Sequence, residues 1–305
     1  MLNVSGHDSN GKSAPYKQVH CINQVKRSML ALNVEWLGMG QLSQPNLTHS
    51  RMNQLDLCGA SGLAPFYLSL KRGLDVLLAQ PGADPARVAV TGCSGGGWQT
   101  IFISALDRRV TLANPVAGYS SFRTRVRHLK DLGDSEQTPC DLATLADYTH
   151  LTAMMAPRAI LLTYNAKDEC CFEAGYALPP LLEAAQPVFN LFGQQNRLRS
   201  HINYDPGTHN YERDNREAFY RMAMWSGGTF QEDTSADVAR SCDSRARTSR
   251  GSGSDGPWPS GSLAARPRNR HPLPRRRTTL RSSVPSTMPT VTTHRASPRR
   301  RSRLR

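Results

Sequence analysis

The sequence predicts an α/β fold in which helices cover both faces of one mostly parallel sheet. Short apolar runs rich in β-branched residues alternate with helical stretches over residues 1–230, which is the pattern of parallel strands joined by crossover helices. One run, at residues 86–91, leads into a glycine-rich turn at residues 92–97 and then into a helical stretch. An acidic residue and a histidine follow in loops after later runs, and parallel sheets place their sites at such strand ends.

Strands and helices are expected in alternation from the start of the chain. Each strand is a short apolar run, and the helices show apolar residues three or four positions apart. In the first helix Val19, Ile22 and Val25 share one face. A Pro-Gly pair ends the second helix, and Pro157 closes the fourth. The expected strands are residues 1–4, 30–37, 86–91, 110–116, 158–164 and 201–204, and the expected helices are residues 16–29, 63–80, 98–106, 142–155, 178–185 and 215–225.

Charge divides the chain into two parts. Residues 1–230 hold 21 Lys and Arg against 19 Asp and Glu, whereas residues 231–305 hold 17 Arg, no Lys and 5 Asp and Glu. This tail is rich in Arg, Ser and Pro and has almost no apolar periodicity, so it is predicted to be disordered. It is an arm that binds polyanions non-specifically, an inert extension, or a non-native extension from a shifted reading frame. The use of Arg without Lys favours the last interpretation, and the catalytic domain is expected within residues 1–230.

The cysteines give no sign of a metal site. All seven lack CxxC spacing, and their odd number favours neither a zinc site nor a disulfide framework. We therefore expect buried free thiols, no metal and no cofactor. No apolar run reaches the length of a membrane span, so no membrane partner is expected. Residues 1–12 lack the layout of a signal peptide, and the compartment stays open, with a periplasmic or secreted location among the options.

Ser94 lies at the centre of Gly-Cys-Ser-Gly-Gly, which fits the pattern G-x-S-x-G. Between a strand and a helix this pattern predicts a nucleophile elbow, a sharp turn that exposes the serine hydroxyl from a strained backbone. The flanking glycines allow backbones to approach where a Cβ would clash. A purely structural glycine loop is the alternative interpretation.

A serine nucleophile needs a general base, and the base needs a carboxylate that orients it. In such folds the chain order is serine, acid, histidine. Asp168 follows the strand at residues 158–164 after a short turn and is the predicted acid, with Glu169 as its rival and a helix N-cap as the structural alternative. His209 lies in a turn-rich loop before the last helix and is the predicted base, with His201 as its rival.

Two N–H donors must stabilise the oxyanion that forms during acyl transfer. We expect one from Gly95, the residue after the nucleophile, and the other from the His7 backbone, in the loop after the first strand. The His7 imidazole is expected either to contact substrate or to be merely exposed.

These residues resemble the α/β-hydrolase superfamily, and most closely its dienelactone-hydrolase-like and acetyl-xylan-esterase-like carbohydrate esterases. The resemblance covers about residues 1–228 and rests on SGHD at residues 5–8, GCSGG at 92–96, NAKD at 165–168 and GTH at 207–209. It implies an α/β-hydrolase fold. Because members of the superfamily place further strands before the oxyanion loop, this chain is expected to be N-terminally shortened and to lack the first strands, which leaves an unpaired sheet edge.

The elbow departs from that of glucuronoyl esterases, which carry Gly-Cys-Ser-Arg-x-Gly-Lys. Gly95 stands where they have the Arg, and Trp98 stands where they have the Lys. The charged groups that would hold a uronate are therefore missing, and specificity for glucuronate esters is not expected.

The expected function is hydrolysis of carboxylic esters by a Ser94–His209–Asp168 triad through an acyl-enzyme, on small-molecule or carbohydrate esters such as acetylated carbohydrates. Residues 119–147 carry a basic group that is either part of the pocket rim or a solvated face: Arg123, Arg125, Arg127 and His128. The alternatives are a peptidase of the prolyl-oligopeptidase kind, a catalytically inactive scaffold with an incomplete sheet, and a role that resides in the polyanion-binding tail. No specific nucleic-acid partner is expected.

Overall fold

The computed structural model describes residues 1–225, which contain a six-stranded sheet whose neighbouring strands are all parallel. These residues belong to one compact unit. The tail and the boundary predicted at residue 230 lie outside the described residues. The strands are β1 (Leu2–Val4), β2 (Leu32–Val34), β3 (Ala89–Cys93), β4 (Leu112–Val116), β5 (Ala159–Asn165) and β6 (Leu198–Asn203).

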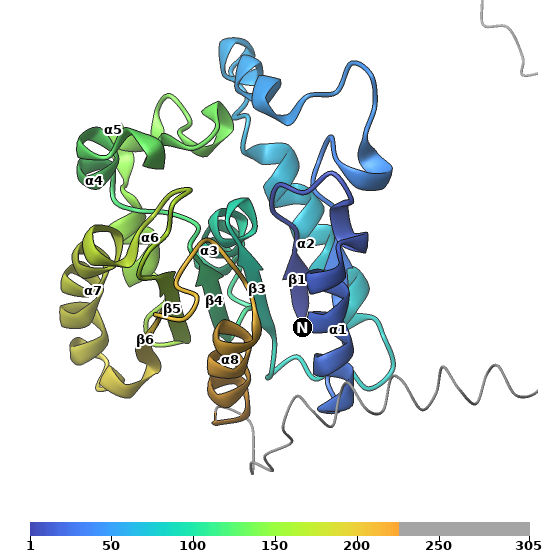
Figure 1. The fold of residues 1–305 in the computed structure, drawn as a ribbon, viewed down its shortest axis with the longest axis vertical. Coiled ribbons are helices and arrows are strands. Elements are labelled where there is room, and N and C mark those ends of the chain that lie inside the picture. The colour runs from blue at the N-terminus through green and yellow to red at the C-terminus, as the bar shows by residue number, and fades with distance from the viewer. Residues whose placement is uncertain (226–305) are drawn as a thin grey trace, which may run out of the picture. The chain divides into compact units, whose positions relative to one another are not determined.

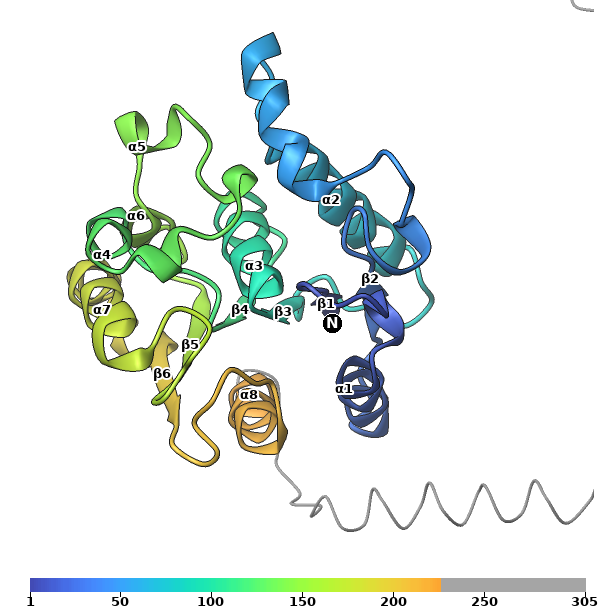
Figure 2. The ribbon, with the colours of Figure 1, turned by 45° about the horizontal axis from the view of Figure 1, so that its top comes forward.

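The strand order across the sheet is β2-β1-β3-β4-β5-β6. Figure 1 shows β1 and β3 to β6, and Figure 2 also shows β2 at the edge beside β1. The chain therefore runs from β1 to β2 in one direction and adds β3 to β6 on the other side of β1. In open parallel sheets, ligands bind beyond the carboxyl ends of the strands at such a change of direction. The loops after β1 and β3 meet at this point, so the topology places any site near residues 5–8 and 94–97.

Helices cover both faces of the sheet, as the sequence predicts. Figure 2 shows α1 and α8 on one face and α2, α3, α6 and α7 on the other. Buried side chains of β3, β4 and β5 pack with Phe219 and Met222 of α8 on one side, and those of β4 and β5 pack with Trp98 and Phe102 of α3 on the other. The helices are α1 (Pro15–Lys26), α2 (Ala64–Leu78), α3 (Gly95–Leu106), α4 (Phe122–Arg127), α5 (Leu142–Leu145), α6 (Tyr148–Ala153), α7 (Ala174–Leu191) and α8 (Arg213–Trp225).

Polar residues form the face of α1 that packs on the sheet. Val19, Ile22 and Val25, which the sequence places on one face, are 40%, 42% and 60% exposed. The buried face carries polar residues instead, because β1 offers a polar partner: Gln24 and Asn3 exchange two side-chain hydrogen bonds of 2.7 and 2.8 Å. A buried amide pair of this kind must stay satisfied, which sets the rotation of the helix.

Two further expectations change in detail. The helix predicted at residues 142–155 is broken into α5 and α6, where Asp147 accepts hydrogen bonds as an N-cap. The prediction of buried thiols holds for Cys93 and Cys171, whereas Cys58, Cys140 and Cys170 are exposed. Within residues 1–225, no helix combines the length and the apolar character that crossing a bilayer requires.

Candidate active site

Ser94 occupies the sharp junction between β3 and α3. Its backbone has φ +59° and ψ −126°, a conformation that a residue with a side chain rarely adopts and that marks functional sites. Two hydrogen bonds hold it there: Ser94 N–H donates to the Val116 carbonyl at 2.9 Å, and Trp98 N–H donates to the Ser94 carbonyl at 3.0 Å. The half-buried serine thus projects from a rigid turn, as the elbow pattern predicts.

The predicted acid and base lie together. Asp168, in the loop after β5, is 1% exposed, and both of its carboxylate oxygens lie 2.9 Å from His209 Nδ1 in the loop after β6. The ionised carboxylate favours the tautomer with the proton on Nδ1, which leaves Nε2 as the acceptor. Asn165 and the backbone N–H groups of Cys170 and Cys171 also donate to this carboxylate.

The rivals considered from sequence have other partners. Glu169 accepts a hydrogen bond of 3.0 Å from the His209 backbone N–H, so it fixes the loop rather than the imidazole. His201 pairs with Asp214 of α8 at 2.8 Å. Asp168 is not a helix N-cap, because the next helix, α7, begins at Ala174 after Glu173.

Between residues 1 and 225, no hydrogen bond joins Ser94 Oγ to His209 Nε2. Their loops nevertheless adjoin, since the Cys93 thiol donates to the Asn210 carbonyl at 3.6 Å. Catalytic hydrogen bonds are often long before substrate binds and shorten in the complex. The arrangement therefore brings the acid and base together and sets the serine beside their loop.

The charge of the pair follows from two opposing effects. Burial alone would lower the pKa of His209, but the hydrogen bond and charge of Asp168 outweigh it, and the pKa lies above the ordinary 6.5. For Asp168, burial opposes ionisation, but the hydrogen bond from His209 outweighs it and holds the pKa below its usual value. The carboxylate is consequently ionised at neutral pH.

We expect kcat/KM for ester hydrolysis to rise with pH through an apparent pKa above 6.5, because only neutral His209 can accept the Ser94 proton. Asp168→Asn removes the charge that raises the pKa of His209, so the rise of kcat/KM should occur at lower pH in this variant. Measured pH–rate profiles of both proteins check this. The assignment of His209 as the base would be contradicted if kcat/KM rose at or below pH 6.5 in the unmodified protein and the rise stayed at the same pH in Asp168→Asn.

The two predicted oxyanion donors lie at the same place. Gly95 opens α3, so its N–H has no acceptor within the helix, and the His7 N–H makes no hydrogen bond to the part of the chain that is described. The backbone after β1 packs closely against the first turn of α3. A Cβ added to Gly96 would lie only 2.4 Å from the Val4 carbonyl oxygen and 3.2 Å from Gly6 N. This close approach requires glycine at residue 96.

Trp36 explains why residue 95 is also glycine. A Cβ placed on Gly95 would lie 2.6 Å from two atoms of the Trp36 ring and 3.2 Å from the His7 ring. Trp36 is fully buried and packs on Phe66 and Trp98, so it has little room to yield. The ring therefore takes the space in which an arginine side chain would begin, and sequence reasoning did not foresee this role because Trp36 lies far from the elbow in the chain.

Gly95→Ala should lower stability by about 1–3 kcal/mol, since the added methyl meets a packed ring, and it should also reduce activity by displacing the Gly95 N–H. Gly175→Ala is the matched control: it is also near the start of a helix, but its nearest neighbour to an added Cβ is 3.8 Å away. Thermal melting and ester hydrolysis of both variants check the prediction, which a fully stable Gly95→Ala would contradict.

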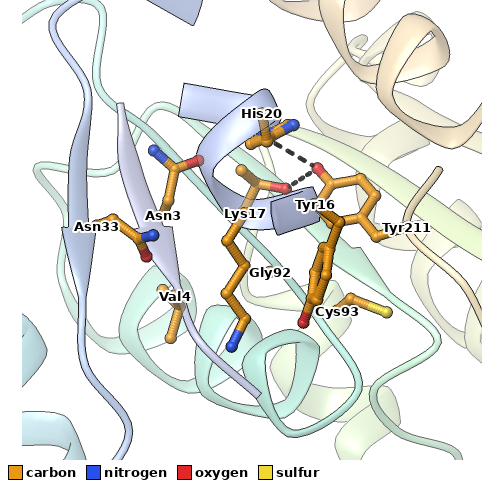
Figure 3. A pocket seen from close by; sticks show the side chains of 10 residues that line it. Asn3, Val4, Tyr16, Lys17, His20, Asn33, Gly92, Cys93 and Tyr211 are labelled. Carbon is orange, nitrogen blue, oxygen red and sulfur yellow. Dashed lines mark hydrogen bonds between the residues drawn. The ribbon is translucent and has the colours of Figure 1, made fainter. Parts of the chain in front are cut away.

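A buried lysine binds the loop after β1, which carries the predicted oxyanion donor His7. Lys17 of α1 donates to the Gly6 carbonyl at 3.4 Å and to the Gly11 carbonyl at 3.0 Å, and burial lowers its pKa. Figure 3 shows it beside a small cavity between α1 and strands β1 and β3, together with Tyr16 and Cys93. At about 20 Å³ the cavity has room for about one water and none for a substrate.

Tyr211 anchors the loop that carries His209. Its hydroxyl lies 2.5 Å from Thr91 Oγ1 of β3 and 3.1 Å from the Asn114 side-chain oxygen of β4, and it points toward His20 of α1 (Figure 3). The predicted base, His209, thus lies two residues from a buried network that joins β3, β4 and α1. A tyrosine two positions after a loop histidine was the only sequence signal for it.

The basic group on residues 119–147 separates into different roles. Arg125 is 1% exposed, stacks 4.2 Å above the Tyr148 ring and donates to backbone carbonyls, so it is a structural residue. Arg123 and Arg127 are exposed, and His128 stacks on Tyr176 at 3.7 Å. The segment reaches the predicted acid through Lys130, whose amine donates to the Asp168 backbone carbonyl at 3.0 Å.

The fold is similar to those of solved esterases. A methylesterase matches with a TM-score of 0.57 and 18% identity, over 73% of this chain and 48% of its own. A family 15 glucuronoyl esterase from Caldicellulosiruptor kristjansonii matches with 0.53 and 16%, over 76% and 72%. Acetyl xylan esterase 1 from Thermoanaerobacterium sp. JW/SL YS485 matches with 0.51 and 18%, over 74% of each chain.

These comparisons confirm the α/β-hydrolase fold predicted from the sequence. The chain spans about half the length of the methylesterase that it matches. No protein-family model matches the sequence, and no curated protein matches it.

Proposed function

We propose that this protein is a serine esterase that hydrolyses carboxylic esters through Ser94, His209 and Asp168. The observation that carries the proposal is the buried Asp168 carboxylate at 2.9 Å from His209 Nδ1, next to a serine held at positive φ at the end of a parallel strand. A buried acid–imidazole pair beside a strained serine is the arrangement that activates a hydroxyl as a nucleophile. The likeness of the fold to solved esterases supports the same conclusion.

The reaction has two halves. Ser94 Oγ attacks the ester carbonyl carbon while its proton passes to His209 Nε2, and the Gly95 and His7 N–H groups donate to the oxyanion. The intermediate then breaks its bond to the alcohol oxygen, which takes the proton from His209 and leaves an acyl group on Ser94. Water repeats the sequence: His209 accepts its proton, its oxygen attacks the acyl carbon, and the acid leaves as Ser94 regains its proton.

Acetylated carbohydrates are the proposed substrate class. Neither of the two elbow positions that carry a charge in glucuronoyl esterases is charged here. The Trp36 ring occupies the space beside Gly95, and the Trp98 side chain is fully buried. A small acyl group without a carboxylate suits such a surface better than a glucuronate. One matched structure is an acetyl xylan esterase, which supports this choice over the methyl and glucuronoyl esters that the other names suggest.

The test uses the purified full chain. It should hydrolyse p-nitrophenyl acetate, and a fluorophosphonate should add to Ser94 and to no other residue, as peptide mass spectrometry would reveal. Acetylated xylan should be cleaved at least about tenfold faster than a glucuronate methyl ester, a difference of about 1.4 kcal/mol in transition-state binding. A folded protein that neither turns over the acetate nor reacts at Ser94 would overturn the proposal, whereas a reversed preference would overturn only the substrate class.

A further inference from the structure

Four potential metal ligands from three distant segments meet beside the oxyanion loop. His7 follows β1, His49 begins the 3₁₀ helix His49–Cys58, and Asp134 and Glu136 lie at the 3₁₀ turn Ser135–Gln137. One donor atom from each lies within 4.8 Å of the donor atoms of the other three. Since His49 and Glu136 are 87 residues apart, no local spacing in the sequence announces the cluster.

The donor set suits a first-row divalent ion. His7 Nε2 lies 2.8 Å from Asp134 Oδ2, and His49 Nδ1 lies 2.8 Å from Glu136 Oε1. Two imidazole nitrogens and two carboxylate oxygens are ligands of zinc, which binds each at about 2.0–2.2 Å in a tetrahedron. Donors around such an ion stand about 3.5 Å apart, so small side-chain shifts from the separations seen here are sufficient.

A second observation points to a cation independently of this grouping. The Glu136 side chain is 0% exposed, and its Oε2 has no hydrogen-bond partner among residues 1–225. Its other oxygen is satisfied by His49, yet a buried carboxylate oxygen without a partner is costly. A metal ion between the two pairs would supply that missing interaction.

The surroundings resemble the outer layer of a metal site. The Trp36 ring lies 4.4 Å from the His7 ring and 5.4 Å from the His49 ring, which gives the cluster an apolar wall. Ser135 Oγ donates to the Ser50 carbonyl at 2.7 Å, so the segments that carry the ligands are already joined. Such supporting contacts orient ligands and raise affinity.

We propose that His7, His49, Asp134 and Glu136 bind one Zn²⁺ ion, which ties residues 38–60 and 129–147 to the loop that carries the His7 N–H. The ion would clamp this loop against Gly95 and take no part in the chemical steps. Binding itself does not depend on the proposed esterase activity, so each can fail separately.

The experiment is titration of the full chain with ZnCl₂ after removal of metals by EDTA, followed by calorimetry, with Co²⁺ absorption as a probe of tetrahedral coordination. One equivalent should bind. His49→Ala and Glu136→Gln should each weaken binding by at least about 100-fold. His201→Ala is the control variant. It removes an imidazole that lies 2.8 Å from the Asp214 carboxylate, the same distance as in the two pairs of the cluster, and it should leave zinc binding unchanged.

Glu136→Gln keeps the size of the side chain and its contact with His49, so its far-ultraviolet circular dichroism should match that of the unmodified protein. Failure to bind one equivalent would overturn the proposal. So would binding that survives in both cluster variants. Loss of binding in a Cys170→Ser, Cys171→Ser double variant alone would place the ion instead at the group formed by these thiols and His209, which also overturns it.

Discussion

Ser94→Ala should lower kcat/KM for p-nitrophenyl acetate by a factor on the order of 10⁴ to 10⁶, because loss of the nucleophile removes the acyl-enzyme route. The fold should be unaffected, since the Ser94 hydroxyl makes no hydrogen bond within the described part of the chain and its backbone bonds to Val116 and Trp98 remain. Some hydrolysis above the rate in water should persist, through the oxyanion donors acting on a bound ester.

Ser104→Ala is the matched control for this variant. Ser104 lies on the same helix, α3, and its hydroxyl is buried without a hydrogen-bond partner, so its removal costs no interaction. Its activity should stay within about twofold of the unmodified protein, as for most substitutions away from a site. Ser94→Ala with activity within tenfold of the unmodified protein would exclude Ser94 as the nucleophile.

His209→Ala should cause a loss of similar size, because without the base the Ser94 proton has no acceptor. His201→Ala is its control: both imidazoles are about one-fifth exposed and lie 2.8–2.9 Å from a carboxylate, so each variant breaks one comparable pair. Activity of the His201 variant should fall less than about threefold.

The double variant Ser94→Ala, His209→Ala tests whether the two residues act together in catalysis or affect activity independently. Residues that act together are not additive, so the double variant should be no slower than Ser94→Ala alone. Steady-state kinetics of the four proteins measure this. A larger loss of activity in His201→Ala than in His209→Ala would instead identify His201 as the general base.

Local sequence patterns were sufficient to predict those features that depend on a residue's neighbours in the chain. The apolar run before Gly92 and the glycines around Ser94 predict the elbow, because a strand that turns at once into a helix needs these residue types. Asp168 and His209 were predicted because each lies in a loop that follows a strand, and parallel strands bring the loops after them to one edge of the sheet. Their pairing at 2.9 Å agrees with that reasoning.

Roles that depend on another element were not visible in the same way. The apolar residues of α1 share one face, yet the helix turns Gln24 inward because Asn3 of β1 presents a matching amide. The clash of a residue 95 side chain with Trp36 and the Tyr211 anchor on β3 and β4 likewise arise between elements. Helical periodicity measures hydrophobicity within one segment and carries no information on the partner's polarity.

The sequence by itself determined the α/β class, the serine turn and the order of acid and histidine, because backbone propensity, apolar periodicity and strand-end position are properties of short segments. The tertiary structure alone decided which face of α1 is buried, why residue 95 carries no side chain, and that His7, His49, Asp134 and Glu136 meet. These depend on packing between segments that are tens of residues apart, where close-packed side chains and buried polar groups must each find a specific partner.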